Sequence, residues 1–248
     1  MQVIKIGGNE LDELAFRQGL ATAVATFSEP VIIVHGGGKA IADMQQRLGL
    51  QPVKVDGVRV TDAASLDVAQ MVLSGHANKL IVSALLAANV QAFGISGVDG
   101  GLLRCQKKHH PTVDLGYVGE IVQVNTHILH HLLAAGVTPV VSPISLGLAD
   151  GQIYNVNADD AAAAIARAAS ANLLTFVSNV PGVLDQQGQL IPVLTAQQTE
   201  DLILQGVIHG GMIPKVRAAL QVISQDVPQA RIVNLAGLGV NSGTLFTA

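Results

Sequence analysis

The chain has 248 residues, of which 49% are hydrophobic and 13% charged, so it can bury a large core and is not a disordered chain. Its net charge of −4 argues against a protein that coats nucleic acid. The single cysteine, Cys105, excludes an intramolecular disulfide and a cysteine-rich zinc site, and we expect it to be a buried small hydrophobe.

The N-terminal residues carry no basic segment and no apolar run of the length that an export signal needs. No run of about 18 apolar residues occurs anywhere in the chain. We therefore expect a soluble, cytoplasmic protein without a membrane segment.

Strand-like and helix-like patterns alternate through the first half of the chain. We expect strands over 2–6, 31–34, 91–96 and 138–142, helices over 10–27, 39–48, 62–73, 76–88 and 126–135, and antiparallel ribbons over 53–60, 102–106 and 117–124. Thr61 is the expected cap of the helix over 62–73, and Gly75 is expected to separate that helix from the next. Asp56-Gly57 is a strong hairpin signal, with Arg59 on the return strand.

The second half repeats the pattern of strand, turn and helix. We expect strands over 173–177, 231–235 and 244–247, a short strand within 178–185, and helices that begin near 157, 195 and 209, with 152–155 leading into the first of these helices. Near-continuous apolar strands that alternate with helices predict an α/β protein. Its open, mostly parallel central sheet should be the middle layer of a three-layer αβα sandwich. The best candidate seam between two lobes is 147–151.

Polar side chains gather where the helix after residue 157 begins. Asn155 and Asn157 are followed by Asp159 and Asp160, and a run of alanines comes next. Asn157 or Asp159 can cap this helix. Side chains of such a turn point toward whatever lies beyond the strand ends.

Glycine-rich turns follow several of the expected strands, and two distant lysines accompany them. Lys5 precedes Gly7-Gly8, the turn 36–38 opens a helix, and Lys215 follows Gly210-Gly211. Parallel strands end at one edge of a sheet, where ligands of open α/β proteins bind. Free backbone N–H groups and lysines suit a polyanion such as a phosphate chain. The chain has no P-loop, no dinucleotide-binding glycine motif and no G-x-S-x-G motif.

The histidines provide the only other candidate site. His127, His130 and His131 have helical spacing, and His109-His110 lies in a polar segment. Without acids or cysteines at ligand spacing we expect solvated or half-buried side chains and no metal site.

Several stretches taken together resemble the acetylglutamate kinases, a branch of the amino acid kinase superfamily, over nearly the whole chain. The matching stretches are 4–8, 34–38, 57–61, 155–159, 177–185 and 210–216. The resemblance implies the amino acid kinase fold and transfer of the γ-phosphoryl group of ATP, with Mg²⁺, to the side-chain carboxylate of N-acetyl-L-glutamate in arginine biosynthesis.

The resemblance also assigns roles to individual residues. Lys5 and Lys215 would stabilise the transferring phosphoryl group, and Asp159 would hold both lysines in place. The acceptor would be bound by Gly37, Gly38, Arg59 and Asn155. The nucleotide would be bound by Gly8, Ser178, Val180, Gly182, Gly210 and Met212.

The implied organisation is an N-terminal lobe over 1–150 for acetylglutamate binding and dimerisation and a C-terminal lobe over 151–248 for ATP. Because the chain begins so close to Lys5, the resemblance implies a homodimer that arginine does not inhibit. The sequence departs from the family at Asn179, where an aspartate is usual, and in a short stretch over 234–243. These departures bear on ATP binding. The altered tail leaves open a non-catalytic regulatory paralogue. A sibling kinase of the same architecture, acting on acetylaminoadipate or glutamate, is the other alternative.

Overall fold

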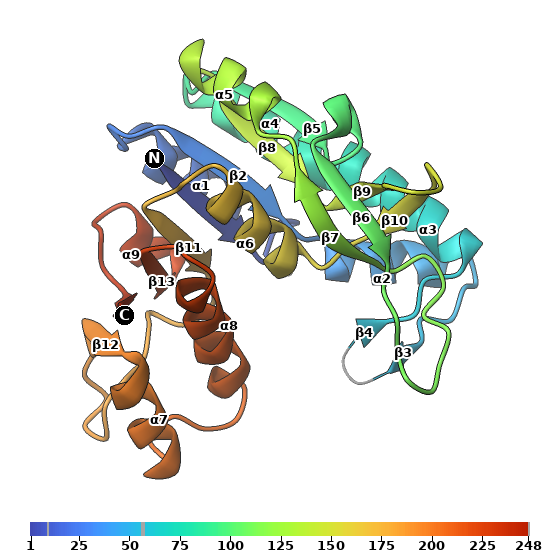
Figure 1. Ribbon diagram of the computed structural model, residues 1–248. Coiled ribbons are helices and arrows are strands. Elements are labelled where there is room, and N and C mark those ends of the chain that lie inside the picture. Colours follow the sequence, from blue (N-terminus) through green and yellow to red (C-terminus); the bar gives the residue numbers. More distant parts are fainter. Residues whose placement is uncertain (9, 56–57, 248) are drawn as a thin grey trace.

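A computed structural model describes residues 1–8, 10–55 and 58–247, and it is built around an eight-stranded sheet (Figure 1). In spatial order the strands are β12 (Val193–Thr195), β14 (Thr244–Thr247), β13 (Gln229–Val233), β11 (Leu173–Val177), β1 (Gln2–Ile6), β2 (Val31–His35), β8 (Thr138–Ser142) and β5 (Ala92–Ser96). From β13 to β5 all neighbours are parallel, whereas β14 is antiparallel to β13. The predicted open, mostly parallel sheet is confirmed.

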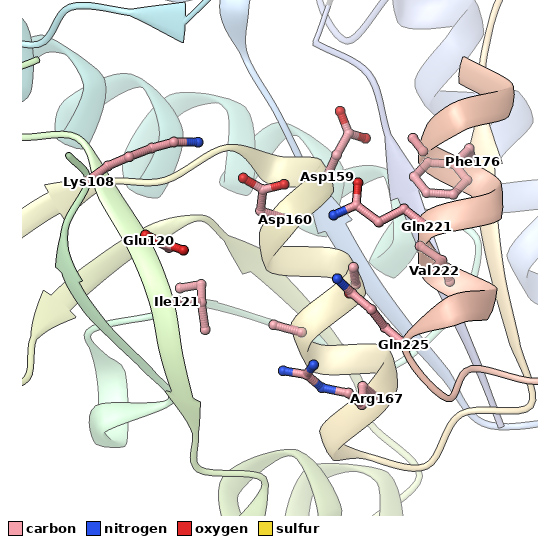
Figure 2. Close-up of a pocket in the computed structure, with 13 residues that line it drawn as sticks. Lys108, Glu120, Ile121, Asp159, Asp160, Arg167, Phe176, Gln221, Val222 and Gln225 are labelled. Carbon is pink, nitrogen blue, oxygen red and sulfur yellow. The ribbon is translucent and has the colours of Figure 1, made fainter. Parts of the chain in front are cut away.

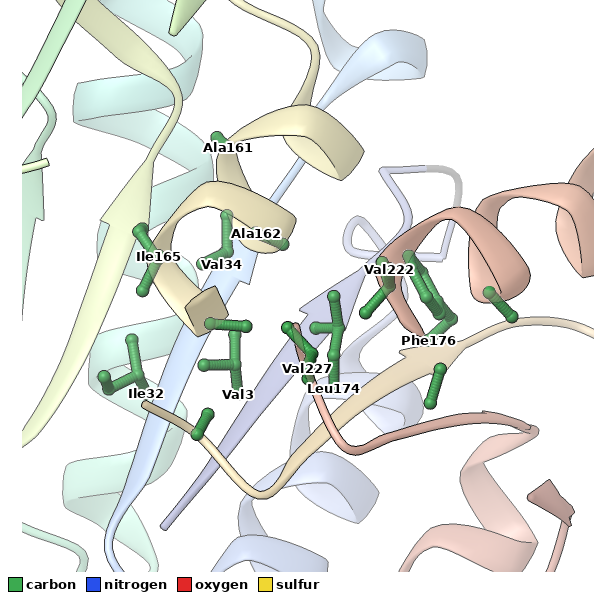
Figure 3. Packing of buried hydrophobic residues seen from close by; sticks show 14 of the residues in the cluster. Val3, Ile32, Val34, Ala161, Ala162, Ile165, Leu174, Phe176, Val222 and Val227 are labelled. Atoms are coloured by element: carbon green, nitrogen blue, oxygen red, sulfur yellow. The ribbon is translucent and has the colours of Figure 1, made fainter. Parts of the chain in front are cut away.

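Helices cover both faces of the sheet. They are α1 (Leu14–Ala25), α2 (Gly38–Arg47), α3 (Ala63–Gln70), α4 (Asn78–Ala87), α5 (His127–Ala134), α6 (Ala158–Ala168), α7 (Ala196–Leu204), α8 (Met212–Ser224) and α9 (Leu235–Leu238). Ile4 and Ile6 pack in one core cluster with α1 and α4, whereas Val3 packs in another with α6 and α8 (Figure 3). Alternation along β1 therefore places Lys5 on the same face as Val3, which is the face that α6 covers.

A smaller sheet lies beside the main one. Its order is β10 (Ile153–Asn155), β9 (Ile144–Gly147), β6 (Leu103–Lys107) and β7 (Gly119–Val124), and the predicted antiparallel ribbon is the pair β6 and β7. The division expected at residue 150 falls in the turn between β9 and β10. The hairpin is confirmed as β3 (Lys54–Val55) paired with β4 (Val58–Arg59), and its turn residues lie outside the described residues.

The region after β4 differs from prediction in two ways. Asp62, not Thr61, caps α3, because its carboxylate accepts a hydrogen bond from the Ser65 N–H at 2.8 Å, while Thr61 is buried. Gly75 does not separate two helices, because a π-helix, η1 (Met71–Ala77), joins α3 directly to α4. A π-helix tolerates a glycine within it, and such segments are frequent at functional sites.

Other helix and strand boundaries differ from the predicted ones for local reasons. The helix expected from residue 10 begins at Leu14, and the strand expected to reach 235 ends at Val233, because Asn234 caps α9 by accepting from the Gly237 N–H. The stretch 178–185 forms no strand, only a bridge between Leu184 and Leu190. A short 3₁₀-helix, η2 (Asp99–Gly101), follows β5. In the described ranges no helix has the length and apolar character needed to cross a bilayer.

Candidate active site

Glycine-rich turns meet at the carboxyl edge of the main sheet. The last residue of β1, Ile6, is in register with His35 of β2 and Val177 of β11. The turns 7–8, 36–38 and 178–182 therefore leave neighbouring strands at one edge, which is where open α/β proteins bind ligands.

Lys5 forms an ion pair at this edge. Its Nζ lies 2.8 Å from Oδ1 of Asp159, and its side chain is only 16% exposed. Asp159 stands in the first turn of α6, whose cap is Asn157, with Oδ1 accepting from the Asp159 N–H at 2.8 Å. The capping residue thus fixes the helix start that presents the carboxylate to Lys5.

The first two glycine turns touch through their backbones. A Cβ atom added to Gly8 would lie 2.5 Å from both Cα and N of Gly37 and 2.6 Å from N of Gly38. Only glycine at position 8 allows this approach. The two turns consequently form one continuous surface of backbone groups beside Lys5.

A cavity of about 330 Å³ opens over these turns. It is lined by residues from β1, the turn 36–38, η1, the start of β7 and the start of α6: Lys5, Gly8, Gly36, Gly37, Gly38, Ile41, Leu73, Lys108, Val118, Gly119, Pro143, Asn155, Val156, Asn157, Ala158 and Asp160. The structure therefore brings Lys5, Gly8, Gly37, Gly38 and Asn155 together, as members of the set singled out in the sequence.

Asn155 is held at the end of β10. Its backbone N–H donates to the Tyr117 carbonyl at 2.9 Å, and its Nδ2 lies 3.4 Å from Oγ1 of the buried Thr61. Thr61 follows β4, where the backbone of Arg59 lies, so the hairpin and the end of β10 are neighbours. The side chain of Arg59 lies outside the described part of the structure.

Lys215 has a different partner from the one expected. It lies in the first turn of α8, and its Nζ is 3.4 Å from Oδ1 of Asn179, in the turn that follows β11. Among the described residues it makes no ion pair with Asp159, contrary to the expectation that Asp159 holds both lysines. A second cavity, of about 490 Å³, lies between α6 and α8 and is lined by Asp159 of α6 and Gln221 of α8 (Figure 2).

The remaining predicted nucleotide contacts lie around Lys215, outside the 330 Å³ cavity. Ser178 donates from Oγ to Oδ1 of Asn179 at 3.3 Å, and Val180 and Met212 are partly buried against the core. Gly210 precedes α8 with φ +54°. These residues line one side of the same sheet edge.

Gly182 has a clear structural reason to be glycine. Its φ is +147°, and an added Cβ would lie 2.6 Å from Oγ1 of Thr244. That hydroxyl accepts from the Val183 N–H at 2.8 Å and donates to the Ile191 carbonyl at 2.7 Å. A glycine here lets the turn after β11 lie against β14.

Two charged residues to which the sequence assigned no role line both cavities. Lys108 follows β6 and Asp160 follows Asp159, and Figure 2 shows Lys108 across from the start of α6, which carries Asp160. Burial raises the pKa of Asp160, the nearby Lys108 lowers it, and the Asp159 and Glu120 charges raise it further. No spacing rule points to Lys108, because it reaches the site only through the pairing of β6 with β7.

Cys105 takes no part in this chemistry. Cys105 is buried, and burial raises the pKa of its thiol to about 12, so it is no nucleophile at neutral pH. Within the described ranges no group of three or more His, Cys, Asp or Glu side chains could hold a metal ion.

The comparisons with known proteins agree with this geometry. Residues 1–234 match the model of the amino acid kinase family. The acetylglutamate kinase of Chloroflexus aurantiacus is 51% identical over 247 residues, which is 100% of this chain and 96% of the relative. That of Methanopyrus kandleri is 43% identical over 99% of each chain. The crystal structure of smu.665 from Streptococcus mutans UA159 superposes with a TM-score of 0.81 at 29% identity, covering 100% of this chain and 98% of the other. The chain therefore belongs to the amino acid kinase family.

Proposed function

We propose that this protein transfers the γ-phosphoryl group of ATP to the side-chain carboxylate of N-acetyl-L-glutamate, forming N-acetyl-L-glutamyl 5-phosphate in arginine biosynthesis. The observation that carries the proposal is the pairing of Lys5 with Asp159 beside touching glycine turns, in a chain that matches acetylglutamate kinases from end to end. Relatives at this identity and coverage support a shared substrate.

The chemistry needs little beyond position and charge. A carboxylate acceptor is already ionised at pH 7, so the site needs no general base. The bond between the γ-phosphorus and the β,γ-bridging oxygen of ATP breaks, a bond from phosphorus to a carboxylate oxygen forms, and ADP leaves. Lysine ammonium groups and backbone N–H groups stabilise the negative charge that is spread over the transferring group. The absence of a catalytic serine or histidine motif in the sequence is consistent with such a reaction.

The positions of the residues support the following roles. Lys5 and the amides of Gly8, Gly37 and Gly38 surround the acceptor carboxylate and the phosphoryl group, and Asp159 orients Lys5. Asn155 and Arg59 bind the rest of the acceptor. Lys215 stabilises the transferring phosphoryl group together with Lys5, and the nucleotide is bound by Gly8, Ser178, Val180, Gly182, Gly210 and Met212.

The same placement supports two functional lobes, with the acceptor bound by 1–150 and ATP by 151–248, in one continuous sheet. Asn155 stands at their junction and contacts Thr61 of the first lobe. Mg²⁺ enters with ATP, bound chiefly by phosphate oxygens, as is usual for this ion. With ATP as its donor, the protein acts in the cytoplasm.

An assay of ADP release with three acceptors tests the proposal. N-acetyl-L-glutamate should support turnover, whereas L-glutamate and N-acetyl-L-aminoadipate should give a kcat/KM lower by about 10²-fold or more. L-glutamate lacks the acetyl amide and N-acetyl-L-aminoadipate has a longer side chain, so neither should fit the acceptor site. Equal turnover with aminoadipate would assign the chain to a sibling activity. No ADP release with any acceptor would mark a non-catalytic paralogue.

Replacing Lys215 by alanine should lower kcat by about 10²-fold and change the KM for acetylglutamate little, because the lost charge acts mainly in the transition state. Steady-state kinetics with both substrates measure this. Asn179→Ala removes the 3.4 Å contact to Nζ and the 3.3 Å contact to Oγ of Ser178, and it should cost less than about tenfold. Near-normal turnover of the Lys215 variant would refute its role.

Arg59→Ala should mainly raise the KM for acetylglutamate, because a guanidinium that binds a substrate carboxylate contributes equally in the ground and transition states. Arg47→Ala, in the last turn of α2, is the matched control and should leave both constants unchanged. A fall in kcat alone would contradict the assignment.

The exposed edge strand of the main sheet supports the proposal that the protein is a homodimer. β5 is the last strand of the eight-stranded sheet, and it exposes 54% of Phe93, while the neighbouring helix α4 exposes 47% of Leu86. An exposed edge strand with apolar neighbours is a surface that a second copy can cover. Two-fold symmetry would pair this surface with itself.

Phe93→Glu should convert the dimer to a monomer in light scattering after gel filtration, because it places two charges across the symmetric interface. Leu204→Glu is the control, since Leu204 is 85% exposed on α7, at the other end of the molecule. Identical masses for wild type and Phe93→Glu would place the interface elsewhere.

A further inference from the structure

A buried imidazole lies directly beneath the turn 36–38. His35, the last residue of β2, is fully buried, with Nδ1 2.9 Å from the Gly36 carbonyl oxygen and Nε2 3.2 Å from Nδ2 of Asn78. Burial lowers the pKa of His35 to about 4, so the ring is neutral at pH 7 and carries one proton. Which nitrogen carries that proton decides whether the ring can donate to Gly36.

Asn78, also fully buried, decides this question. Its Nδ2 donates to the Val140 carbonyl at 2.9 Å, and its Oδ1 accepts from Nζ of Lys79 at 2.9 Å. If the Asn78 amide were flipped, its Oδ1 would face the Val140 carbonyl oxygen and its Nδ2 would face Nζ of Lys79. Acceptor would then meet acceptor, and donor would meet donor. Nδ2 must therefore face His35, so Nε2 is the acceptor and Nδ1–H donates to Gly36.

The π-helix η1 positions Asn78 and also contacts the turn 36–38 through Leu73. Asn78 follows its last residue directly, and Leu73 within it packs so closely that a Cβ on Gly37 would lie 2.7 Å from Cδ2 of Leu73. Gly94 of β5 leaves room for the amide, because a Cβ there would lie 1.9 Å from Oδ1 of Asn78. The surrounding chain is thus shaped to seat one asparagine under one histidine.

We propose that His35 and Asn78 are positioning residues for phosphoryl transfer, which hold the Gly36 carbonyl and thereby the shape of the turn that lines the acceptor cavity. The inference rests on the proposed function for its kinetic consequence. The fixed ring proton at Nδ1 is a property of the fold and can be observed without substrate. A hydrogen bond between buried partners restrains the turn at no cost in reorganisation when the substrate binds.

The kinetic test compares two ways of removing a buried amide. Asn78→Leu should lower kcat about 10-fold to 10²-fold, with the KM for ATP within about twofold of wild type, because misplaced donors weaken transition-state stabilisation. Gln45→Met is the matched control, since Gln45 is equally buried and bonds Ser65 at 2.9 Å, away from the turn. It should lose similar thermal stability and keep its kcat. Equal losses of kcat in both variants would overturn the inference.

A second pair of variants covers the case in which Asn78→Leu fails to fold. In His35→Asn an amide nitrogen can occupy the place of Nδ1 and still donate to Gly36, whereas His35→Leu removes the donor. The asparagine variant should recover most of the kcat that the leucine variant loses. Equal kcat in the two would overturn the positioning role.

Nitrogen NMR of histidine-labelled protein separates this inference from the proposed function. The signal that disappears in His35→Asn should belong to a neutral ring protonated at Nδ1 at pH 7. A ring protonated at Nε2 would overturn the inference even in an active kinase. A wild type that phosphorylates no acetylglutamate but shows the Nδ1 proton would sink the proposed function and leave the restraint on the turn in place.

Discussion

Lys5→Ala is expected to lower kcat by about 10³-fold while changing the KM for acetylglutamate by less than about fivefold. Lys5 lines the cavity over the glycine turns, and Asp159 holds it at 2.8 Å with most of its side chain buried. An ammonium group that is already fixed in a site with little water stabilises the charge of the transition state without reorganising. Such a group can therefore raise kcat by several powers of ten. Steady-state kinetics with saturating ATP measure the effect.

Lys39→Ala is the matched control for charge. Lys39 also pairs with carboxylates, Asp12 at 3.2 Å and Asp43 at 2.8 Å, but its side chain is 51% exposed on the outside of α2. Its removal should leave kcat within about twofold of wild type, since exposed ion pairs contribute little. If the two alanine variants lost activity to the same extent, the effect would come from net charge and not from Lys5.

Gly8→Ala is expected to cost about 10³-fold in kcat/KM and to lower the melting temperature. The added Cβ would lie 2.5 Å from backbone atoms of Gly37, so one turn must move. A shift of about 1 Å at a reacting centre can cost 10²-fold, and here the amides of both turns move together. Overpacking of this kind destabilises by about 1–3 kcal/mol.

Gly75→Ala gives the contrast for the same substitution. No atom lies within 4 Å of a Cβ added there, and the residue sits in the helical segment η1. It should keep full activity and gain about 0.5–1 kcal/mol of stability, because alanine has less freedom in the unfolded chain. Full activity in Gly8→Ala would show that the contact between the turns is dispensable.

The parts of the fold that the sequence predicts well are those set by local chemistry. The strands at 138–142 and 173–177 have the expected bounds, and Asn157 and Thr195 cap their helices as their positions suggest. A continuous apolar run bounded by turn residues indicates a strand that is buried on both faces, so the sequence alone marks where it begins and ends. Alternation along β1 is also enough to place Lys5 on the face that a capped helix covers.

The parts that the sequence misses depend on packing between distant segments. The π-helix brings Leu73, and Asn78 directly after it, to the turn 36–38, and no propensity scale encodes such contacts between distant segments. The partner of Lys215 is Asn179, in the turn after β11, and this contact joins residues that lie 36 positions apart in the chain. Lys108 enters the site only through the pairing of β6 with β7, which joins segments whose register is not local.

Trapping the product with hydroxylamine tests most directly whether the site formed by Lys5 and the glycine turns transfers a phosphoryl group to a side-chain carboxylate. Wild-type protein with ATP, Mg²⁺ and N-acetyl-L-glutamate should yield the side-chain hydroxamate, identified by mass spectrometry, in equal amount to the ADP released, and Lys5→Ala should yield almost none. ADP release without hydroxamate, or undiminished hydroxamate in Lys5→Ala, would contradict the account.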